Sequence, residues 1–318
     1  MIGFNGKMNN MNGIYRVYED GILIAEQKNK LTVLGRANAL KAMLGSTQSF
    51  ASSMGIGVDS TANDTTVYHN KTDLGFNVGK YPVVSSSLGN TETYDALVYT
   101  ARITDQSRYN ITELGLFANR VASGFENENQ VIFDFEDGDP FTFSVNPSTL
   151  IPDAEWYSTV ADPNPIFRIG NSCLNMKNSS ALATWNSSTI NLSNVAPYDD
   201  FCLAANFVTN AALTIKFESD TSAYATYTFT PGGTGYKVIS VSKSSVTPTG
   251  DLDWSKVNKI TIDAGGQVYL DGLRIKKYRT PDSTEGLVSR AVLSTPIEKK
   301  FGSIIDVQYL LEVMLETV

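Results

Sequence analysis

Residues 303–313 read SIIDVQYLLEV, and this stretch near the end of the chain decides how the fold closes. Apolar residues alternate there with mostly polar neighbours, at Ile305, Val307, Tyr309, Leu311 and Val313. A period of two predicts a β-strand with one buried face. Such a strand needs a partner sheet, and LVSRAVL at 287–293 resumes the same kind of pattern just before it. We therefore predict that residues 281–318 close a β-sandwich that residues 1–130 open.

The N-terminal part supplies the strands for that sandwich. Asp20-Gly21 separates two alternating segments, and this dipeptide favours a hairpin turn. A short helix is predicted next, because apolar residues recur at helical spacing and Gly45 stands where a C-cap is expected. The helix positions are Val33, Ala37, Leu40 and Leu44, and the predicted strands are IYRVYE (14–19), ILIAEQ (22–27), ASSMGIGV (51–58), YDALVYTARI (94–103) and NITELGLF (110–117).

Composition marks residues 131–280 as an inserted domain. All three tryptophans and both cysteines fall within it, whereas the single histidine lies outside. Short apolar segments follow one another with Gly, Pro and Asn turns between them, which is typical of a sandwich or jelly roll. We predict an all-β fold: a discontinuous β-sandwich of residues 1–130 and 281–318 with one short helix, and an inserted β-jelly-roll domain. The strands predicted in the insert are VIFDFE, FTFSV, IFRIG, ALATW, FCLAANFV, LTIKFES, AYATYTFT, YKVISVS, KITIDA and QVYLDGLRIKKY.

Charge and hydropathy exclude several classes of partner. The 318 residues carry a net charge of -8, so a field that attracts phosphate backbones is missing and nucleic acid is not an expected ligand. No apolar run approaches the roughly 18 residues that span a bilayer, so membrane insertion is not expected. The start, MIGFNGKMNNMNG, lacks a secretory signal, and we expect assembly in a cytoplasm. Without secretion, Cys173 and Cys202 are predicted to be buried thiols.

Motifs outside the insert follow a recognisable order. They are the helix LTVLGRANALKAML (31–44), Gly55-x-Gly57, the E-x-G-L-F strand (113–117), Ser289-Arg290-Ala291 and the Thr295–Lys299 segment. This order resembles a β-sandwich module of tailed-bacteriophage structural proteins, including tail, collar and fibre-attachment proteins, and the resemblance covers about half of the chain. In such relatives the E-x-G-L-F strand often leads directly into the S/A-R-A strand. Here the insert separates the two. The resemblance implies a protein that docks into a virion.

The insert resembles the carbohydrate-binding jelly rolls attached to polysaccharide-degrading enzymes. Its first strands, FDFEDGDPFTFSV, and its last, WSKVNKITIDAGGQVYLDGLRI, carry the likeness. Many of those modules hold a structural Ca²⁺ where an early acidic strand lies beside the final strand. The resemblance implies Asp134, Glu136 and Asp271 as side-chain ligands, with Asp139 as a further candidate. Carboxylates and carbonyls at adjacent strand ends suit the six to eight oxygens that Ca²⁺ takes. The alternative is a solvated acidic turn.

Catalytic constellations are weak in this sequence. A Ser/His/Asp triad could be built only around His69, which lies in the polar segment YHNKTD. Glycoside hydrolysis needs two carboxylates that face each other across a sugar, one of them with a raised pKa. Nothing in the spacing of the candidate carboxylates says that two of them converge, and we expect the protein not to be an enzyme. Those candidates are Glu155, Glu218, Asp199 and Asp200.

Sugar binding is the better-supported chemistry, since pyranose faces stack on exposed aromatic rings while polar side chains read the hydroxyls. The candidates are Trp156, Tyr157, Trp185 and Tyr198. Trp156 and Tyr157 lie in the loop-like IPDAEWYSTVADPNP and are preferred, whereas Trp185 ends a predicted strand and also suits the core. Trp254 is predicted to pack at the sandwich edge. In the outer part, Glu113 is predicted to accept local hydrogen bonds, with Arg290 as its partner.

Two functions follow from these patterns. The first is a bacteriophage virion structural protein of the tail, collar or baseplate, which docks through the outer sandwich and displays the carbohydrate-binding-like insert for host attachment. Its expected partners are other virion proteins, copies of itself and host cell-surface polysaccharide. The alternative is a carbohydrate-active enzyme or a secreted accessory carbohydrate-binding protein, which predicts a secretion signal and paired catalytic carboxylates.

Overall fold

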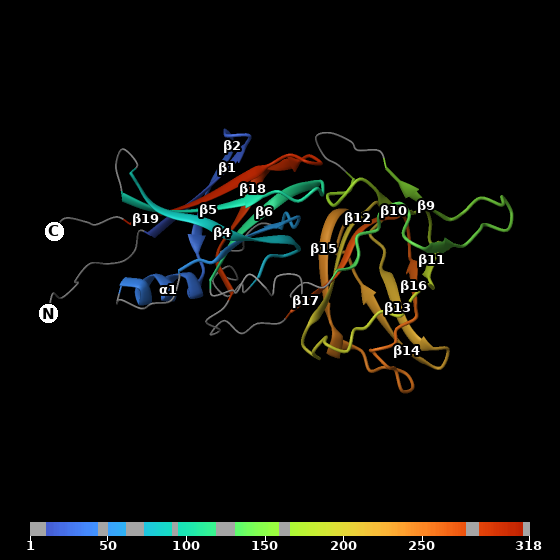
Figure 1. Cartoon of the computed structure of the whole chain (residues 1–318). Helices are drawn as coiled ribbons and strands as arrows, with labels where there is room; N and C mark the ends of the chain where they lie inside the picture. Colours follow the sequence, from blue (N-terminus) through green and yellow to red (C-terminus); the bar gives the residue numbers. More distant parts are fainter. Residues whose placement is uncertain are drawn as a thin grey trace. The chain divides into compact units, whose positions relative to one another are not determined.

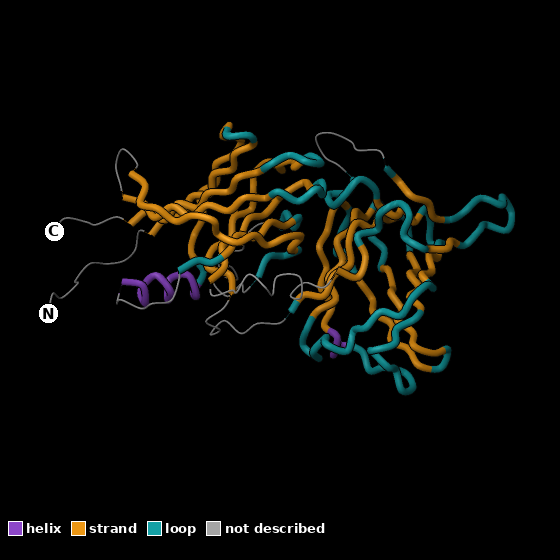
Figure 2. The backbone as a smooth tube through the Cα atoms, viewed as in Figure 1, coloured by secondary structure: helices purple, strands orange, loops and turns teal. Residues whose placement is uncertain are grey.

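The computed structural model describes residues 11–43, 50–61, 73–90, 95–118, 131–158, 166–277 and 286–313. Within these ranges the chain consists mainly of β-strands, with one α-helix and one short 3-10 helix (Figures 1 and 2). The chain divides into two compact units. The barrel unit comprises Met1–Phe125 and Arg279–Val318, and the sandwich unit comprises Glu126–Tyr278. The all-β fold class is confirmed.

The strands of the barrel unit are hydrogen-bonded in one closed path, in the order β1-β19-β5-β4-β3-β6-β18-β2. The sequence predicted a sandwich, and the two sheets are present, but they share β2 and β4 and so close on each other. The strand bounds are β1 (Met11–Glu19), β2 (Ile22–Leu31), β3 (Ser53–Gly57), β4 (Asn77–Asn90), β5 (Asp95–Ile103), β6 (Tyr109–Ala118), β18 (Gly286–Lys299) and β19 (Ile305–Val313).

The C-terminal strand completes the sheet that the N-terminal hairpin begins. β19 lies between β1 and β5, with Tyr309 opposite both Tyr15 and Tyr99. The rings of Tyr15 and Tyr309 meet edge to face at 4.9 Å, and Ile305 and Val307 are buried on the same face. Alternation in SIIDVQYLLEV therefore predicted the correct inner face of this strand.

The α-helix of the described residues, α1 (Val33–Met43), is fixed at its N-terminus by Thr32. The Thr32 hydroxyl accepts a hydrogen bond from the Gly35 amide at 3.1 Å, which is the usual role of an N-cap threonine. Gly35 lies so close to the Val288 carbonyl of β18 that a Cβ there would collide with it. The expected C-cap, Gly45, lies outside the described residues. None of the described helices is long and apolar enough to cross a membrane.

The sandwich unit consists of two antiparallel sheets around one apolar core. One sheet has the order β15-β12-β17-β10-β9, with β7 also paired to β17, and the other has the order β14-β13-β16-β11-β8. A 3-10 turn, η3 (Lys243–Ser245), follows β15. The bounds are β7 (Val131–Phe133), β8 (Phe141–Phe143), β9 (Ala154–Tyr157), β10 (Cys173–Met176), β11 (Leu182–Trp185), β12 (Asp200–Phe207), β13 (Leu213–Asp220), β14 (Ala223–Phe229), β15 (Gly235–Ser242), β16 (Lys259–Ala264) and β17 (Val268–Lys276).

Candidate functional site

The sheet that contains β17 has two chemically different faces. Leu174, Met176 and Leu270 point into the core. Because side chains alternate along a strand, the residues between them lie on the opposite face of the sheet. That face carries Asn175 on β10 and Tyr269 on β17, so it combines amide and aromatic groups where the core face is purely apolar.

Five side chains on this polar face form a straight row across the sheet. Tyr236 of β15 pairs with Asn206 of β12, and Asn206 pairs with Tyr269 of β17. Tyr269 pairs in turn with Asn175 of β10, and Asn175 pairs with Glu155 of β9. We call these five residues the tyrosine row. Its members alternate between flat aromatic rings and amides before ending in a carboxylate.

Asn175 lies between Tyr269 and Glu155 in the tyrosine row, and one of its polar atoms has no hydrogen-bond partner among the described residues. Its side-chain Nδ2 donates to Glu155 Oε1 at 3.2 Å, and this contact fixes the orientation of the amide, because a carboxylate only accepts. The opposite atom, Asn175 Oδ1, is buried and has no hydrogen-bond partner within the described part of the protein, although the residue is only 5% exposed. An unpaired buried acceptor costs about 1–3 kcal/mol. A hydroxyl donor placed over the row would remove that cost.

Two tyrosines make an aromatic surface beside Asn175. The rings of Tyr157 and Tyr269 meet edge to face at 5.2 Å, and both are half-buried. Burial raises the pKa of Tyr269, and the neighbouring Tyr157 raises it further. The Tyr269 phenol is therefore neutral at physiological pH, and Gln267 Nε2 donates to the Tyr269 hydroxyl at 3.4 Å. A neutral ring with an oriented hydroxyl suits a neutral polar ligand.

Tyr236, at the other end of the tyrosine row, is held from two sides. The Arg168 guanidinium lies 3.9 Å from the centre of its ring, and its hydroxyl donates to Asp271. Asp271 also accepts the backbone amides of Arg168, at 2.8 Å, and Ile169, at 3.1 Å. Burial raises the pKa of Asp271 to about 7, although these hydrogen bonds act in the opposite direction. Asp271 therefore positions both Tyr236 and the chain at 168–169.

The aromatic residues predicted to bind sugar lie on different faces of the sandwich unit. Trp185 is 4% exposed and belongs to the core, and Trp156 lies in strand β9, where its ring packs against Phe141 and Phe143. Both predictions are corrected: β9 pairs with β10, and this pairing turns Trp156 toward the core. Tyr157, the next residue, lies on the polar face. Tyr198 is 63% exposed but lies before the opposite end of β12, away from Asn206.

The predicted calcium ligands do not fit a calcium site. Both carboxylate oxygens of Asp271 accept backbone amides, Asp134 binds Arg274 at 2.9 Å, and Glu136 accepts the Asn171 amide and the Ser172 hydroxyl. Among the described residues, no group of three or more His, Cys, Asp or Glu side chains could hold a metal ion. The three carboxylates instead receive protein donors, and for Asp134 that donor is the Arg274 guanidinium. We assign no calcium to them.

The predicted strand IFRIG, residues 166–170, is also corrected. In the structure only Ile169 forms a β-bridge and the other four residues are loop, and Asp271 accepts the backbone amides of Arg168 and Ile169. Gly170 has a φ of 65°, a conformation that breaks extended structure and that glycine adopts without strain. Cys173 and Cys202 are both buried and neither forms a disulfide, as the sequence predicted.

Carboxylates considered for catalysis are mostly held in ion pairs. Glu218 binds Lys216 at 2.9 Å and Lys259 at 3.1 Å, and these two cations lower its pKa although its burial opposes them. Asp199 binds Lys277 at 2.8 Å. Burial raises the pKa of Asp200, Lys276 acts in the opposite direction, and the neighbouring Asp199 carboxylate raises it further. His69 lies outside the described residues. The expectation that the protein is not an enzyme stays a prediction.

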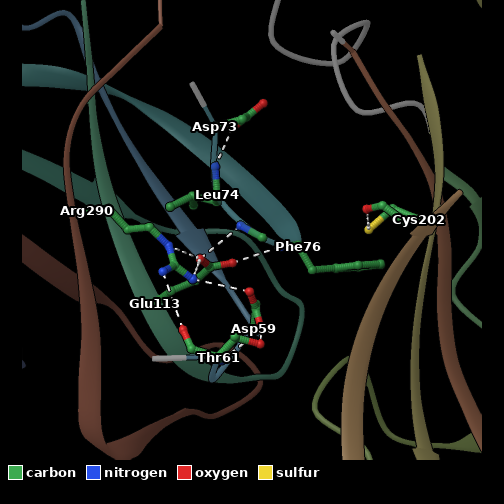
Figure 3. A network of polar contacts seen from close by, with 10 residues as sticks. Asp59, Thr61, Asp73, Leu74, Phe76, Glu113, Cys202 and Arg290 are labelled. Atoms are coloured by element: carbon green, nitrogen blue, oxygen red, sulfur yellow. Dashed lines mark hydrogen bonds and ion pairs between the residues drawn. The ribbon is translucent and has the colours of Figure 1, made fainter. Parts of the chain in front are cut away.

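The barrel unit contains a separate network of buried charges (Figure 3). Arg290 on β18 and Glu113 on β6 are completely buried and lie 2.8 Å apart, as predicted from the sequence. Glu113 also accepts the backbone amides of Gly75 and Phe76, and Arg290 binds Asp59 at 3.2 Å. The network ties the loop around residue 75 and the end of β3 to two central strands. It has a structural role, because every charged group in it has a partner.

Sequence reasoning missed four of the five members of the tyrosine row. It considered Glu155 only as a catalytic candidate, and it did not single out Tyr236, Asn206, Tyr269 or Asn175. Each has a weak local signal, since it occupies a polar position between apolar neighbours in a strand, as in CLNM and QVYLD. Their common row depends on pairing between residues far apart in the sequence, such as Asn175 and Tyr269. No spacing in the sequence encodes this pairing.

Comparisons with known proteins gave similarities only among solved structures, since no protein-family model and no curated protein matches the chain. The family 11 carbohydrate-binding module of cellulase Lic26A-Cel5E of Clostridium thermocellum is 12% identical, with a TM-score of 0.34, over 47% of this chain and 95% of that chain. The family 30 module of cellulase CEL9D-CEL44B of the same organism is 12% identical, with a TM-score of 0.35, over 49% of this chain and 99% of that chain. CsCBM6-3 of Clostridium stercorarium, in complex with cellobiose, is 15% identical, with a TM-score of 0.27, over 48% of this chain and 94% of that chain. These values do not establish a shared family.

Proposed function

We propose that the sandwich unit binds a polysaccharide through the tyrosine row. The observation that carries this proposal is the unsatisfied Oδ1 of Asn175, flanked in the row by Tyr269 and Glu155. A sugar ring stacked on Tyr269 would present hydroxyls around its edge. One hydroxyl would donate to Asn175 Oδ1, and Glu155 or Asn206 would receive another.

The geometry supports an extended ligand. Neighbouring strands lie roughly 4.8 Å apart, so a row across five strands is about 19 Å long. Tyr236 is covered on one side by Arg168, so the rings of Tyr157 and Tyr269 are the ones we assign to stacking. We propose binding without chemistry, because Glu155 is the one carboxylate of the tyrosine row and glycoside hydrolysis needs two that face each other across the sugar.

We assign the barrel unit to docking in a tailed-phage particle. This assignment rests on the order of motifs that resembles virion structural proteins, and Glu113 and Arg290 belong to two of those motifs. Many copies in one particle would turn weak sugar affinity into firm attachment to a host surface. A secreted accessory carbohydrate-binding protein would use the same tyrosine row, so locating the chain in purified particles by imaging decides between the two contexts.

The test of sugar binding is titration of the full chain with soluble polysaccharides chosen from a glycan array. Tyr269→Ala is expected to weaken binding at least tenfold, which is about 1.4 kcal/mol. Asn175→Ala is expected to weaken it similarly. Tyr198→Ala is the matched control, since this tyrosine is more exposed but lies outside the row, and it is expected to bind like the unaltered protein. Unchanged affinity in Tyr269→Ala, or no glycan bound at all, would refute the proposal.

A further inference from the structure

Strand β4 of the barrel unit changes partner halfway along its length. Its first part, up to Pro82, pairs with β3, and its second part pairs with β5. No described strand pairs with the other edge of residues 85–90, and the side chains from Ser85 to Leu88 are exposed. Within the described residues, the backbone amides and carbonyls along that edge therefore have no strand partner. An open edge of this kind is a template for adding another strand.

This edge lacks the features that normally block strand addition. The open part of β2 offers a contrast, because it has an irregular register near Tyr18 and carries the exposed charges Glu26 and Lys28. Bulges and charges protect edges from pairing. Residues 85–90 of β4 read SSSLGN, without a charge or a proline, and their register with β5 is regular.

Leu88 is the most informative residue on this edge, because its side chain is 81% exposed. It lies opposite Leu97 of β5, which in turn lies opposite Leu311 of β19. Exposure rises along this apolar row, from 3% at Leu311 to 37% at Leu97. A row of leucines that ends at an open strand edge indicates that its continuation lies on another strand.

We propose that a second copy of this chain supplies that strand, through antiparallel pairing of the two β4 edges about a two-fold axis at Leu88. Such an interface brings the same patch of both copies together, so the patch must complement itself. Leu88 opposite Leu88 of the second copy extends the leucine row across both sheets. The net charge of -8 opposes contact between most surfaces of two copies, whereas this segment is uncharged.

The proposed register also fits the length of the strand. With Leu88 on the axis, Ser87 lies opposite Gly89 and Ser86 opposite Asn90 of the second copy. The new ladder then stays within the regular part of β4 and ends before the irregularity between Val83 and Ser85. A contact of five residue pairs buries less than the roughly 1,200–2,000 Å² of a stable interface. We therefore expect weak association in solution, strengthened where many copies are held together.

Cross-linking of the full chain tests the register without requiring a stable dimer. Directly opposed residues have Cβ atoms about 4.5–5.5 Å apart, close to the spacing that a disulfide needs. Under mild oxidation Leu88→Cys is expected to form a covalent dimer at least ten times faster than Ser85→Cys, the matched control, which has no opposed copy of itself. Equal rates for the two variants, or no dimer from Leu88→Cys, would overturn the proposal.

Sedimentation with charged variants supplies the second measurement. Leu88→Lys and Leu88→Glu are each expected to raise the dimer dissociation constant at least tenfold, and an equal mixture of the two is expected to restore association, because opposite charges then face each other at the axis. Leu150→Lys, an equally exposed leucine of the sandwich unit, is the control that leaves association unchanged. A mixture that stays monomeric would contradict the register. Neither experiment depends on glycan binding by the sandwich unit.

Discussion

Replacement of Arg290 by methionine tests whether the buried charge network holds the barrel unit together. Arg290 is completely buried and is the cation shared by Glu113 and Asp59, which are themselves buried. Methionine keeps much of the side-chain length but removes the charge. The carboxylates of Glu113 and Asp59 would then stay buried without a counter-charge. The site is tightly packed, because a Cβ added at Gly57 would collide with Glu113 and one added at Gly75 would collide with Asp59. Little space is therefore left for a water molecule that could compensate the lost charge.

The magnitude follows from the burial of both partners. Removing one member of a buried ion pair costs about 3–5 kcal/mol. For a unit of about 165 residues, each kcal/mol lowers the melting temperature by about 2–4 °C, so Arg290→Met is expected to lower it by about 6–20 °C. Arg290→Lys keeps the charge but loses the paired geometry of the guanidinium, and we expect an intermediate loss.

Differential scanning calorimetry of the full chain measures this effect. All three tryptophans lie in the sandwich unit, so tryptophan fluorescence follows that unit separately and its transition is expected to change little. Arg102→Met is the matched control: its ion pair with Asp306 is as short, at 2.7 Å, but the arginine side chain is 57% exposed. Exposed pairs are worth about 1 kcal/mol or less. Equal losses in the two methionine variants would refute the reasoning.

Three further predictions concern the sandwich unit. The pKa of Asp271 is raised to about 7 in the folded protein, so its contribution to stability is greatest below the unfolded pKa and is lost as the pH rises to about 7. In urea titrations, the free energy of unfolding of Asp271→Asn is therefore expected to fall less between pH 5 and 7 than that of the unaltered protein. An equal fall in the two proteins would contradict this. EDTA is expected to leave the melting temperature unchanged, since Asp134, Glu136 and Asp271 already bind protein donors. A lower melting temperature in calorimetry would show that these carboxylates bind calcium. Leu150 has a φ of 57° and is 78% exposed, so Leu150→Gly is expected to raise the free energy of unfolding by about 0.5–1 kcal/mol, and a loss in the same titration would show that the loop is unstrained.

Local sequence patterns correctly predicted hairpins and strands that bury one face. The alternation in SIIDVQYLLEV predicted both the strand and its buried face, and Asp20-Gly21 predicted the hairpin between β1 and β2. The same reasoning failed for IFRIG, whose apolar residues indicate a strand. There the Asp271 carboxylate, about a hundred residues away in sequence, binds the amides of Arg168 and Ile169.

The candidate site was the least predictable part. Trp156 and Tyr157 are adjacent in the sequence and both were sugar-binding candidates, yet only Tyr157 lies on the polar face, because neighbouring residues of a strand point to opposite faces. Which of the two faces the core depends on pairing between β9 and β10. The proposed calcium ligands illustrate the same difficulty, since Arg274 lies three residues after Asp271 and binds Asp134 itself.

Sequence alone determined that this chain is an all-β protein whose last strand completes a sheet begun by its first, because a period of two and turn residues are properties of neighbouring positions. It also predicted Arg290 as the partner of Glu113, because a charge in an apolar strand is stabilised by an opposite charge. Only the tertiary structure decided which polar side chains meet in the tyrosine row and which edge of β4 stays open. Both depend on the register between strands far apart in the chain, and register is set by the packing of the whole sheet.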